Sequence, residues 1–111
     1  MSDQLPDVDP AALDALRELM EDDYPLLLET FLADAKLRLT QLREALVSED
    51  LEAFRQAAHS FKGSCGNMGA LALEQACLIA ERAALEGDTS AASNSYSRIR
   101  ERFIRLQAQL F

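Results

Sequence analysis

The sequence predicts an all-α fold, namely an up-down four-helix bundle with a short additional helix at the N-terminus. Apolar residues recur at alternating steps of three and four, which is the spacing of an amphipathic helix. No segment shows the period of two expected of a strand, and no internal repeat is present. The 111 residues contain no linker, so we expect residues 1–111 to form one domain.

The first two helices are predicted from proline positions and an apolar stripe. Asp9-Pro10 is typical of an N-cap followed by proline at the first helical position, which starts a short helix at about residues 10–20. Pro25 restarts the chain, and we expect a long helix at about residues 23–47. Its apolar face comprises Leu28, Phe31, Ala35, Leu39, Leu42 and Leu46.

The third helix carries the single histidine of the chain. Ser48-Glu49-Asp50 supplies turn and capping residues before it, and we place it at about residues 50–66, where glycines cluster at its end. With about 100° per residue, His59 lies roughly 130° around the helix from the middle of the apolar stripe. His59 is therefore expected to face solvent. The stripe itself comprises Leu51, Phe54, Ala58, Phe61, Cys65 and Met68.

Two more helices complete the bundle. Gly87 favours a C-cap for a fourth helix at about residues 69–86, and Asp88 caps a fifth at about residues 89–110. The fifth has an apolar stripe of Ala92, Tyr96, Ile99, Phe103, Leu106 and Leu110.

Several residues lie close to His59 on the helix surface. Lys62 and Gly63 are one turn beyond it, and Gly66 is two turns beyond it. Arg55 is one turn before it, where we expect it to add local positive charge for the approach of a partner. A lysine binds phosphate oxygens through charge-assisted hydrogen bonds, and each glycine costs roughly 1 kcal/mol of helix stability. The missing side chains open an approach to the imidazole for a bulky partner. We expect the exposed imidazole to be nucleophilic without a neighbouring base and to carry a phosphoryl group.

Plainer interpretations of these residues stay open. The histidine can be an ordinary surface residue, Lys62 a lysine lying along the core edge, and Arg55 a solvated arginine. Gly66 can mark a fraying helix end. Asn67 and Glu81 can reach the site, but the sequence does not fix the direction of their side chains.

The motif His59-x-x-Lys62-Gly63, followed by Gly69-Ala70, resembles the signature of histidine-containing phosphotransfer (HPt) domains, bacterial stand-alone members included. The resemblance extends from about Leu28 to Leu110. It includes Phe31-Leu32-x-Asp34, Leu42-x-x-Ala45-Leu46, Asp50-Leu51 and Gly87, and more loosely Leu13 to Pro25.

The resemblance implies a phosphorelay intermediate. His59 would accept a phosphoryl group from the receiver domain of a hybrid sensor kinase and pass it to the receiver domain of a response regulator. The partner would supply an aspartate and Mg²⁺, and this chain would supply the imidazole and Lys62, with no cofactor of its own. The resemblance also favours a monomer. No glycine-rich nucleotide loop indicates an ATP-dependent kinase.

Two alternatives remain. One is an adaptor that binds receiver domains without phosphorylation. The other is a small hydrolase that uses His59 as a general base, which would require a nucleophile or an orienting carboxylate in a cleft.

Charge and composition exclude several classes of partner. The net charge of −8 argues against nucleic acid and anionic membrane surfaces. Residues 1–4 lack the basic start of a secretory signal, and no apolar stretch approaches a membrane span, so we expect a cytoplasmic protein. Cys65 and Cys77 are expected to be buried thiols, because they show neither metal-ligand spacing with the histidine nor a disulfide framework.

Overall fold

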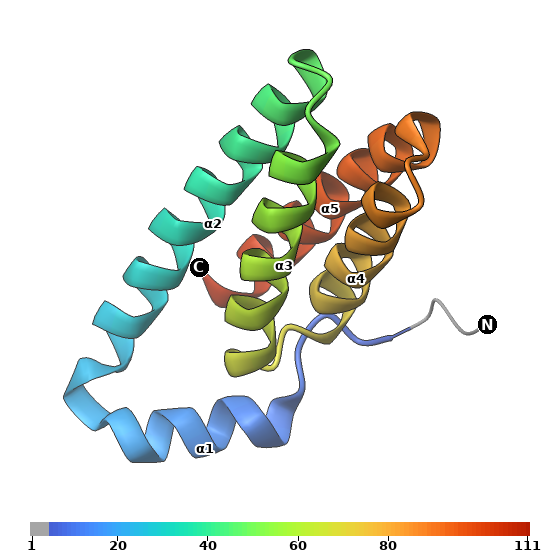
Figure 1. Cartoon of the computed structure of the whole chain (residues 1–111). Helices are drawn as coiled ribbons and strands as arrows, with labels where there is room; N and C mark the ends of the chain where they lie inside the picture. The colour runs from blue at the N-terminus through green and yellow to red at the C-terminus, as the bar shows by residue number, and fades with distance from the viewer. Residues whose placement is uncertain (1–4) are drawn as a thin grey trace.

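The structure, a computed structural model, describes residues 5–111 and contains four long helices that form an up-down bundle (Figure 1). A shorter helix lies across one end of the bundle (Figure 1). The predicted all-α fold is therefore confirmed. The elements are α1 (Pro10–Met20), the 3-10 turn η1 (Glu21–Asp23), α2 (Tyr24–Val47), α3 (Leu51–Asn67), α4 (Leu71–Leu85) and α5 (Thr89–Leu110).

Each observed helix end lies within two residues of its expected position. The helix starts have the expected chemistry, because Asp9, Asp50 and Asp88 accept hydrogen bonds from backbone N–H groups of α1, α3 and α5. Residues 1–4, from which we inferred that a secretory signal is missing, lie outside the described residues.

The core is built from the predicted apolar stripes. On α3, the side chains of Phe54, Phe61 and Cys65 are completely buried, and on α5 the same is true of Ile99. α3 packs most extensively on α4, and α4 packs in turn on α5, so α4 contacts both of its neighbours along the chain. This order places one flank of α4 beside α3 and the other beside α5.

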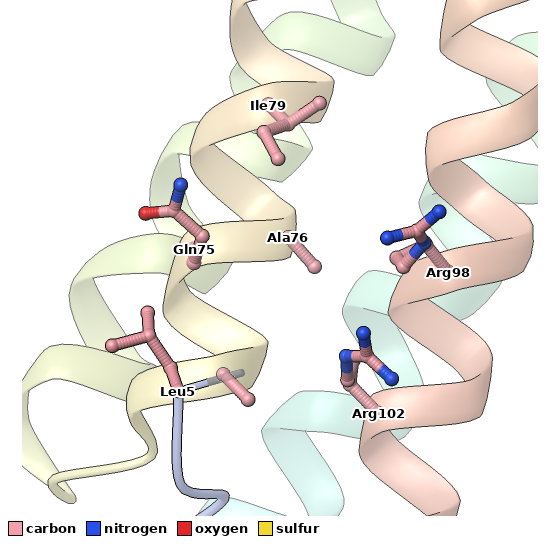
Figure 2. A pocket seen from close by; sticks show the side chains of 7 residues that line it. Leu5, Gln75, Ala76, Ile79, Arg98 and Arg102 are labelled. Atoms are coloured by element: carbon pink, nitrogen blue, oxygen red, sulfur yellow. The ribbon is translucent and has the colours of Figure 1, made fainter. Parts of the chain in front are cut away.

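The segment before α1 holds the N-terminal end of α4. The α4 N-cap is Ala70, which has no side chain that could accept a hydrogen bond. The carbonyl of Pro6 accepts from the Ala72 N–H at 3.1 Å, and Asp7 accepts from Arg105 on α5 at 2.7 Å. Leu5 lies against α4 (Figure 2). These contacts tie the start of the chain to both α4 and α5.

Candidate functional site

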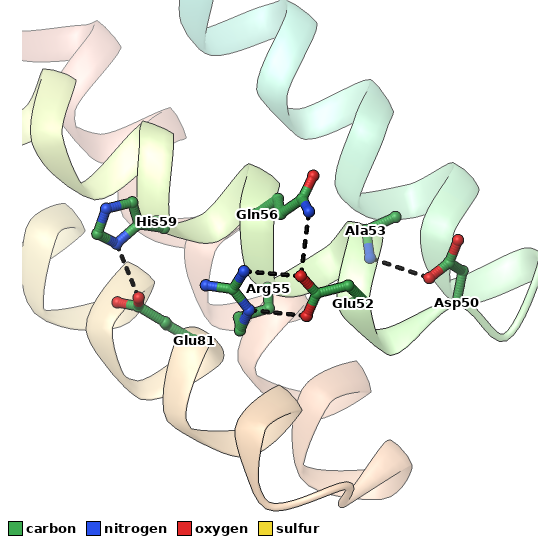
Figure 3. A network of polar contacts seen from close by, with 7 residues as sticks. All are labelled: Asp50, Glu52, Ala53, Arg55, Gln56, His59 and Glu81. Carbon is green, nitrogen blue, oxygen red and sulfur yellow. Dashed lines mark hydrogen bonds and ion pairs between the residues drawn. The ribbon is translucent and has the colours of Figure 1, made fainter.

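His59 projects from the middle of α3, and its side chain is 61% exposed. Asp50 caps the start of α3 by accepting from the Ala53 N–H at 3.0 Å (Figure 3), and the burial of Phe54 and Phe61 turns the face that carries His59 toward solvent. The outward orientation that the helical phase predicted is confirmed.

A carboxylate on the neighbouring helix holds the imidazole. Glu81 on α4 places its Oε2 2.8 Å from Nδ1 of His59 (Figure 3). Only 9% of Glu81 is exposed, so the carboxylate lies within the α3–α4 interface and its position is fixed by packing. A carboxylate accepts, and the ring nitrogen it contacts must therefore donate, which assigns the proton to Nδ1. Nε2 is left with its lone pair available for reaction.

Lys62 engages the second oxygen of the same carboxylate. Its Nζ lies 2.6 Å from Oε1 of Glu81. The hydrogen bond from Lys62 is the main reason why the pKa of Glu81 lies below its ordinary value of 4.5; burial opposes this, and the hydrogen bond from His59 adds to it. Glu81 is therefore ionised at neutral pH and acts as an acceptor from both residues.

The contact with Glu81 corrects one expectation and argues against one of the plainer interpretations. We expected an imidazole without a neighbouring basic group, but a buried carboxylate orients it. Lys62 is not simply a solvated lysine along the core edge, because it forms an ion pair that joins α3 to α4. The ammonium has three donors, so Lys62 can bind Glu81 and still donate to an incoming phosphoryl oxygen.

Glu81 is the functional residue that the sequence analysis left unplaced. It lies 22 residues after His59, and helical spacing alone does not show which α4 residue meets the imidazole. One signal was present: Glu81 stands among the small residues Ala80, Ala83 and Ala84, all of which are buried. A charged residue inside such a stretch is seldom buried unless it has a partner.

The two helical glycines differ in what surrounds them. A Cβ built at Gly63 would meet nothing within 4 Å, so the surface beside His59 is open there, as the proposed partner approach requires. At Gly66, a Cβ would lie 2.8 Å from Oε2 of Glu74 on α4. Gly66 is itself exposed, and the atoms near that position are the far end of a flexible side chain, so the part of Gly66 in the partner approach stays a prediction.

Arg55 lies one turn before His59, but the carboxylate of Glu52 pairs with its positive charge. Nε and Nη2 of Arg55 donate to Glu52 at 2.8 Å and 2.7 Å (Figure 3). These bonds, with a further one from Gln56, lower the pKa of Glu52 to about 2. The predicted local positive charge of Arg55 is thus largely neutralised by Glu52.

Asn67 is not part of the histidine site. It lies at the end of α3 and lines a hollow of about 290 Å³ between α2 and α3, together with Asp34 and Ser64. Ser64 donates to Asp34 at 3.1 Å across this boundary. The expectation that Asn67 can reach His59 receives no support from any hydrogen bond within residues 5–111.

The cysteines are buried free thiols, as expected. Burial, with a smaller effect from the neighbouring Cys77, raises the pKa of the Cys65 thiol. Within residues 5–111, no three histidine, cysteine or acidic side chains gather in a way that could hold a metal ion. In the same part of the chain, no helix combines the length and apolar character needed to span a bilayer.

The fold and the site together define a class of protein: a helical bundle that presents one exposed histidine, oriented by a buried carboxylate and backed by a lysine. The family model for the Hpt domain matches residues 26–109, so the chain belongs to the Hpt domain family. The resemblance found in the sequence is confirmed. Membership in this family supports a phosphorelay role, as a phosphoryl carrier and not as a kinase.

Solved structures agree with this assignment. The chain is 38% identical to histidine-containing phosphotransfer protein B (HptB) from Pseudomonas aeruginosa PAO1, with a TM-score of 0.91, over 96% of this chain and 92% of that one. It shares its fold with the maize histidine-containing phosphotransfer protein ZmHP2, at 19% identity and a TM-score of 0.79, over 95% and 88% of the two chains. No curated protein matches the chain.

Proposed function

We propose that Nε2 of His59 carries a phosphoryl group between the receiver domain of a hybrid sensor kinase and that of a response regulator. The observation that carries this proposal is the bond between Nδ1 and Glu81, which leaves Nε2 as the free nitrogen of a side chain that is 61% exposed. Membership in the Hpt family and the likeness to HptB support the same role. The proposal includes that the protein acts as a monomer in the cytoplasm.

The transfer can be written with its bonds balanced. The Nε2 lone pair attacks the phosphorus of an aspartyl phosphate, an N–P bond forms, the P–O bond breaks, and the aspartate carboxylate leaves with the electron pair. The second transfer is the reverse of this step toward another receiver aspartate. Receiver domains are expected to bring Mg²⁺ with their aspartate, so this chain needs no metal of its own.

Glu81 lowers the energy of the phosphorylated state. Because Nδ1 keeps its proton when Nε2 is phosphorylated, the imidazole ring becomes positively charged. The carboxylate 2.8 Å from Nδ1 then forms a charge-assisted hydrogen bond with a cation, and it stabilises the charge that develops during attack. Lys62 offsets the negative charge that Glu81 would otherwise present to the incoming phosphoryl group.

The surface around His59 suits a large partner. Gly63 presents bare backbone beside the imidazole, with nothing within 4 Å of the position a Cβ would take. A receiver domain can therefore approach closely enough to bring its phosphorus in line with Nε2. We propose Gly63 as a partner-approach residue, with His59 and Lys62 as the residues that act on the phosphoryl group.

A histidine-dependent hydrolase is the weaker alternative. The structure supplies the orienting carboxylate that such an enzyme would need. It does not supply the nucleophile, because no hydroxyl or thiol within residues 5–111 bonds to His59, and Ser64, five residues beyond His59, donates to Asp34 instead. An adaptor that binds receiver domains without transfer is separated from a carrier by experiment.

The test is a transfer assay with a panel of radiolabelled, phosphorylated receiver domains. We expect label on this protein in an acid-labile, base-stable linkage, and none on the His59→Gln variant. Because His59 is exposed, that variant should keep its melting temperature within a few degrees, on the order of the effect of a surface substitution. Receiver binding without label on the parent protein would support the adaptor, and label retained by His59→Gln would overturn the assignment of the residue.

A further inference from the structure

A groove runs between α4 and α5, on the flank of α4 that does not face His59. It comprises two adjoining hollows of about 120 Å³ and about 280 Å³, which share Ala76, Ile79 and Arg98. Figure 2 shows the first hollow, with Ile79 on α4 opposite Arg98 and Arg102 on α5. Ala76 and Glu81 are five residues apart, so their side chains project about 140° apart around α4.

The charge of this groove is opposite to that of the chain. The protein has 19 acidic and 11 basic side chains, yet neither hollow is lined by an acidic residue, whereas two arginines line the first and one of them lines both. The arginines of the groove are Arg98 and Arg102, since Arg105 pairs with Asp7 at 2.7 Å and Arg100 lines neither hollow. A positive strip on an acidic protein attracts negatively charged partners selectively.

The two arginines differ in how far their charges are neutralised. Within residues 5–111, Arg98 forms no ion pair. Arg102 donates to Glu101 through Nη1 at 3.0 Å, and its side chain is only 11% exposed. The guanidinium has five N–H donors, so Arg102 keeps donors beyond this bond where it lines the first hollow. Arg98 therefore supplies the free charge of the groove, and Arg102 supplies further N–H donors to a carboxylate.

The rim of the groove adds apolar contacts. Ile79 is 46% exposed and Leu5 is 38% exposed, and both line the first hollow. Its floor is formed by the small side chains of Ala72 and Ala76, which leave room above them. An occupant would therefore combine aliphatic side chains with acidic ones.

We propose that this groove binds a segment of a partner protein in which acidic and aliphatic residues are adjacent. Carboxylates of the segment bind Arg98 and Arg102, and an aliphatic side chain packs between Leu5 and Ile79. Because His59 lies on the other flank of α4, a partner held here leaves the imidazole free. Anchoring of this kind raises the effective concentration of a receiver domain attached to the same segment.

The test is a two-dimensional NMR titration of the full-length protein. The probes are three ten-residue peptides, each with two glutamates and two leucines in different spacings in a glycine-serine background. Matched peptides carry glutamine in place of glutamate, and inorganic phosphate is the small-anion probe. We expect at least one acidic peptide to shift the amides of Ala76, Ile79 and Arg98, with affinity falling as salt is raised. The glutamine peptides should bind at least ~10-fold more weakly.

Two arginine variants test whether the peptide binds in this groove. Arg98→Glu should weaken binding of the acidic peptide at least ~10-fold. Arg100→Glu makes an equal charge change at an exposed position two residues away and should change the affinity for the peptide less than ~2-fold. The proposal is overturned if no acidic peptide binds, if the glutamine peptides bind equally well, or if the shifted amides surround His59. It is also overturned if inorganic phosphate shifts the same amides at the same concentration. The same holds if these amides shift when the protein concentration is raised without any peptide, which would show that a second copy of the chain occupies the groove.

Discussion

Removal of the Glu81 carboxylate should slow phosphoryl transfer to His59 without abolishing it. In the parent protein, Oε2 of Glu81 lies 2.8 Å from Nδ1 of His59 and accepts the hydrogen bond that keeps the proton on this nitrogen. The carboxylate also stabilises the cationic ring that phosphorylation creates. A hydrogen bond to a charged group is worth about 1.5 to 3 kcal/mol. If that amount is lost from the transition state, Glu81→Ala should slow transfer by about 10-fold to about 100-fold. Glu81→Gln keeps an acceptor but loses the charge, so it should fall between the parent and the alanine variant.

The assay combines two measurements on the same samples. A transfer time course from a phosphorylated receiver domain gives the rate, and nitrogen NMR of the imidazole reports which ring nitrogen carries the proton. The matched control is Glu74→Gln, which removes an acidic charge from the same helix without touching His59. If Glu81→Ala transfers at the parent rate and keeps the proton on Nδ1, Glu81 neither orients nor activates the imidazole.

The same carboxylate should contribute to acid sensitivity. The pKa of Glu81 is lowered in the folded protein, chiefly by Lys62, so its contribution to stability is fully present above the ordinary value of 4.5 and is lost as pH falls through the lowered value. Glu81→Gln removes the titrating group. Its free energy of unfolding should therefore decrease less than that of the parent protein between neutral pH and about pH 3. Parallel pH profiles from denaturant melts would contradict this.

Three further variants test the rest of the site. Lys62→Ala should slow transfer by about 10-fold to about 100-fold and also lower the melting temperature, because it leaves the buried Glu81 carboxylate without its strongest partner. Gly63→Gln should be at least as stable as the parent, since helix propensity improves by up to about 1 kcal/mol, yet bind receiver domains more weakly; a joint loss of stability and activity would show that Gly63 serves packing. Gly66→Ala should leave receiver binding and transfer nearly unchanged, because the end of the Glu74 side chain that lies at that position can move aside; a large loss in a binding titration would show that the partner needs bare backbone at Gly66.

The sequence predicted what depends on spacing within one helix. The apolar stripe of α3 set the core, and the phase of His59 relative to that stripe correctly predicted an exposed side chain. The neutralisation of Arg55 by Glu52 is also a contact within one helix, three residues apart. It could have been inferred from the sequence, because residues at this spacing are neighbours on a helix surface.

Contacts between helices could not be predicted in the same way. The bond from His59 to Glu81 depends on how α4 is rotated and shifted along α3, and single-helix periodicity fixes neither quantity to within one residue. The position of the Glu74 side chain beside Gly66 has the same origin. In both cases the residue type was visible in the sequence, but its partner was set by the packing of α3 on α4.

In this site, Glu81 and an incoming phosphoryl group compete for the ammonium of Lys62. Before phosphorylation, the ammonium of Lys62 lies 2.6 Å from the carboxylate of Glu81, and their opposite charges cancel. A phosphoryl group on Nε2 adds negative charge on three oxygens, and the ring becomes positive, so Glu81 gains a second cationic partner at Nδ1. Lys62 is then less needed by Glu81 and more attracted by the phosphoryl oxygens. A flexible lysine can make this exchange without moving the helices. The phosphorylated and free states then differ in electrostatic energy by less than the bare charges imply, which suits a carrier that must release the group as readily as it accepts it.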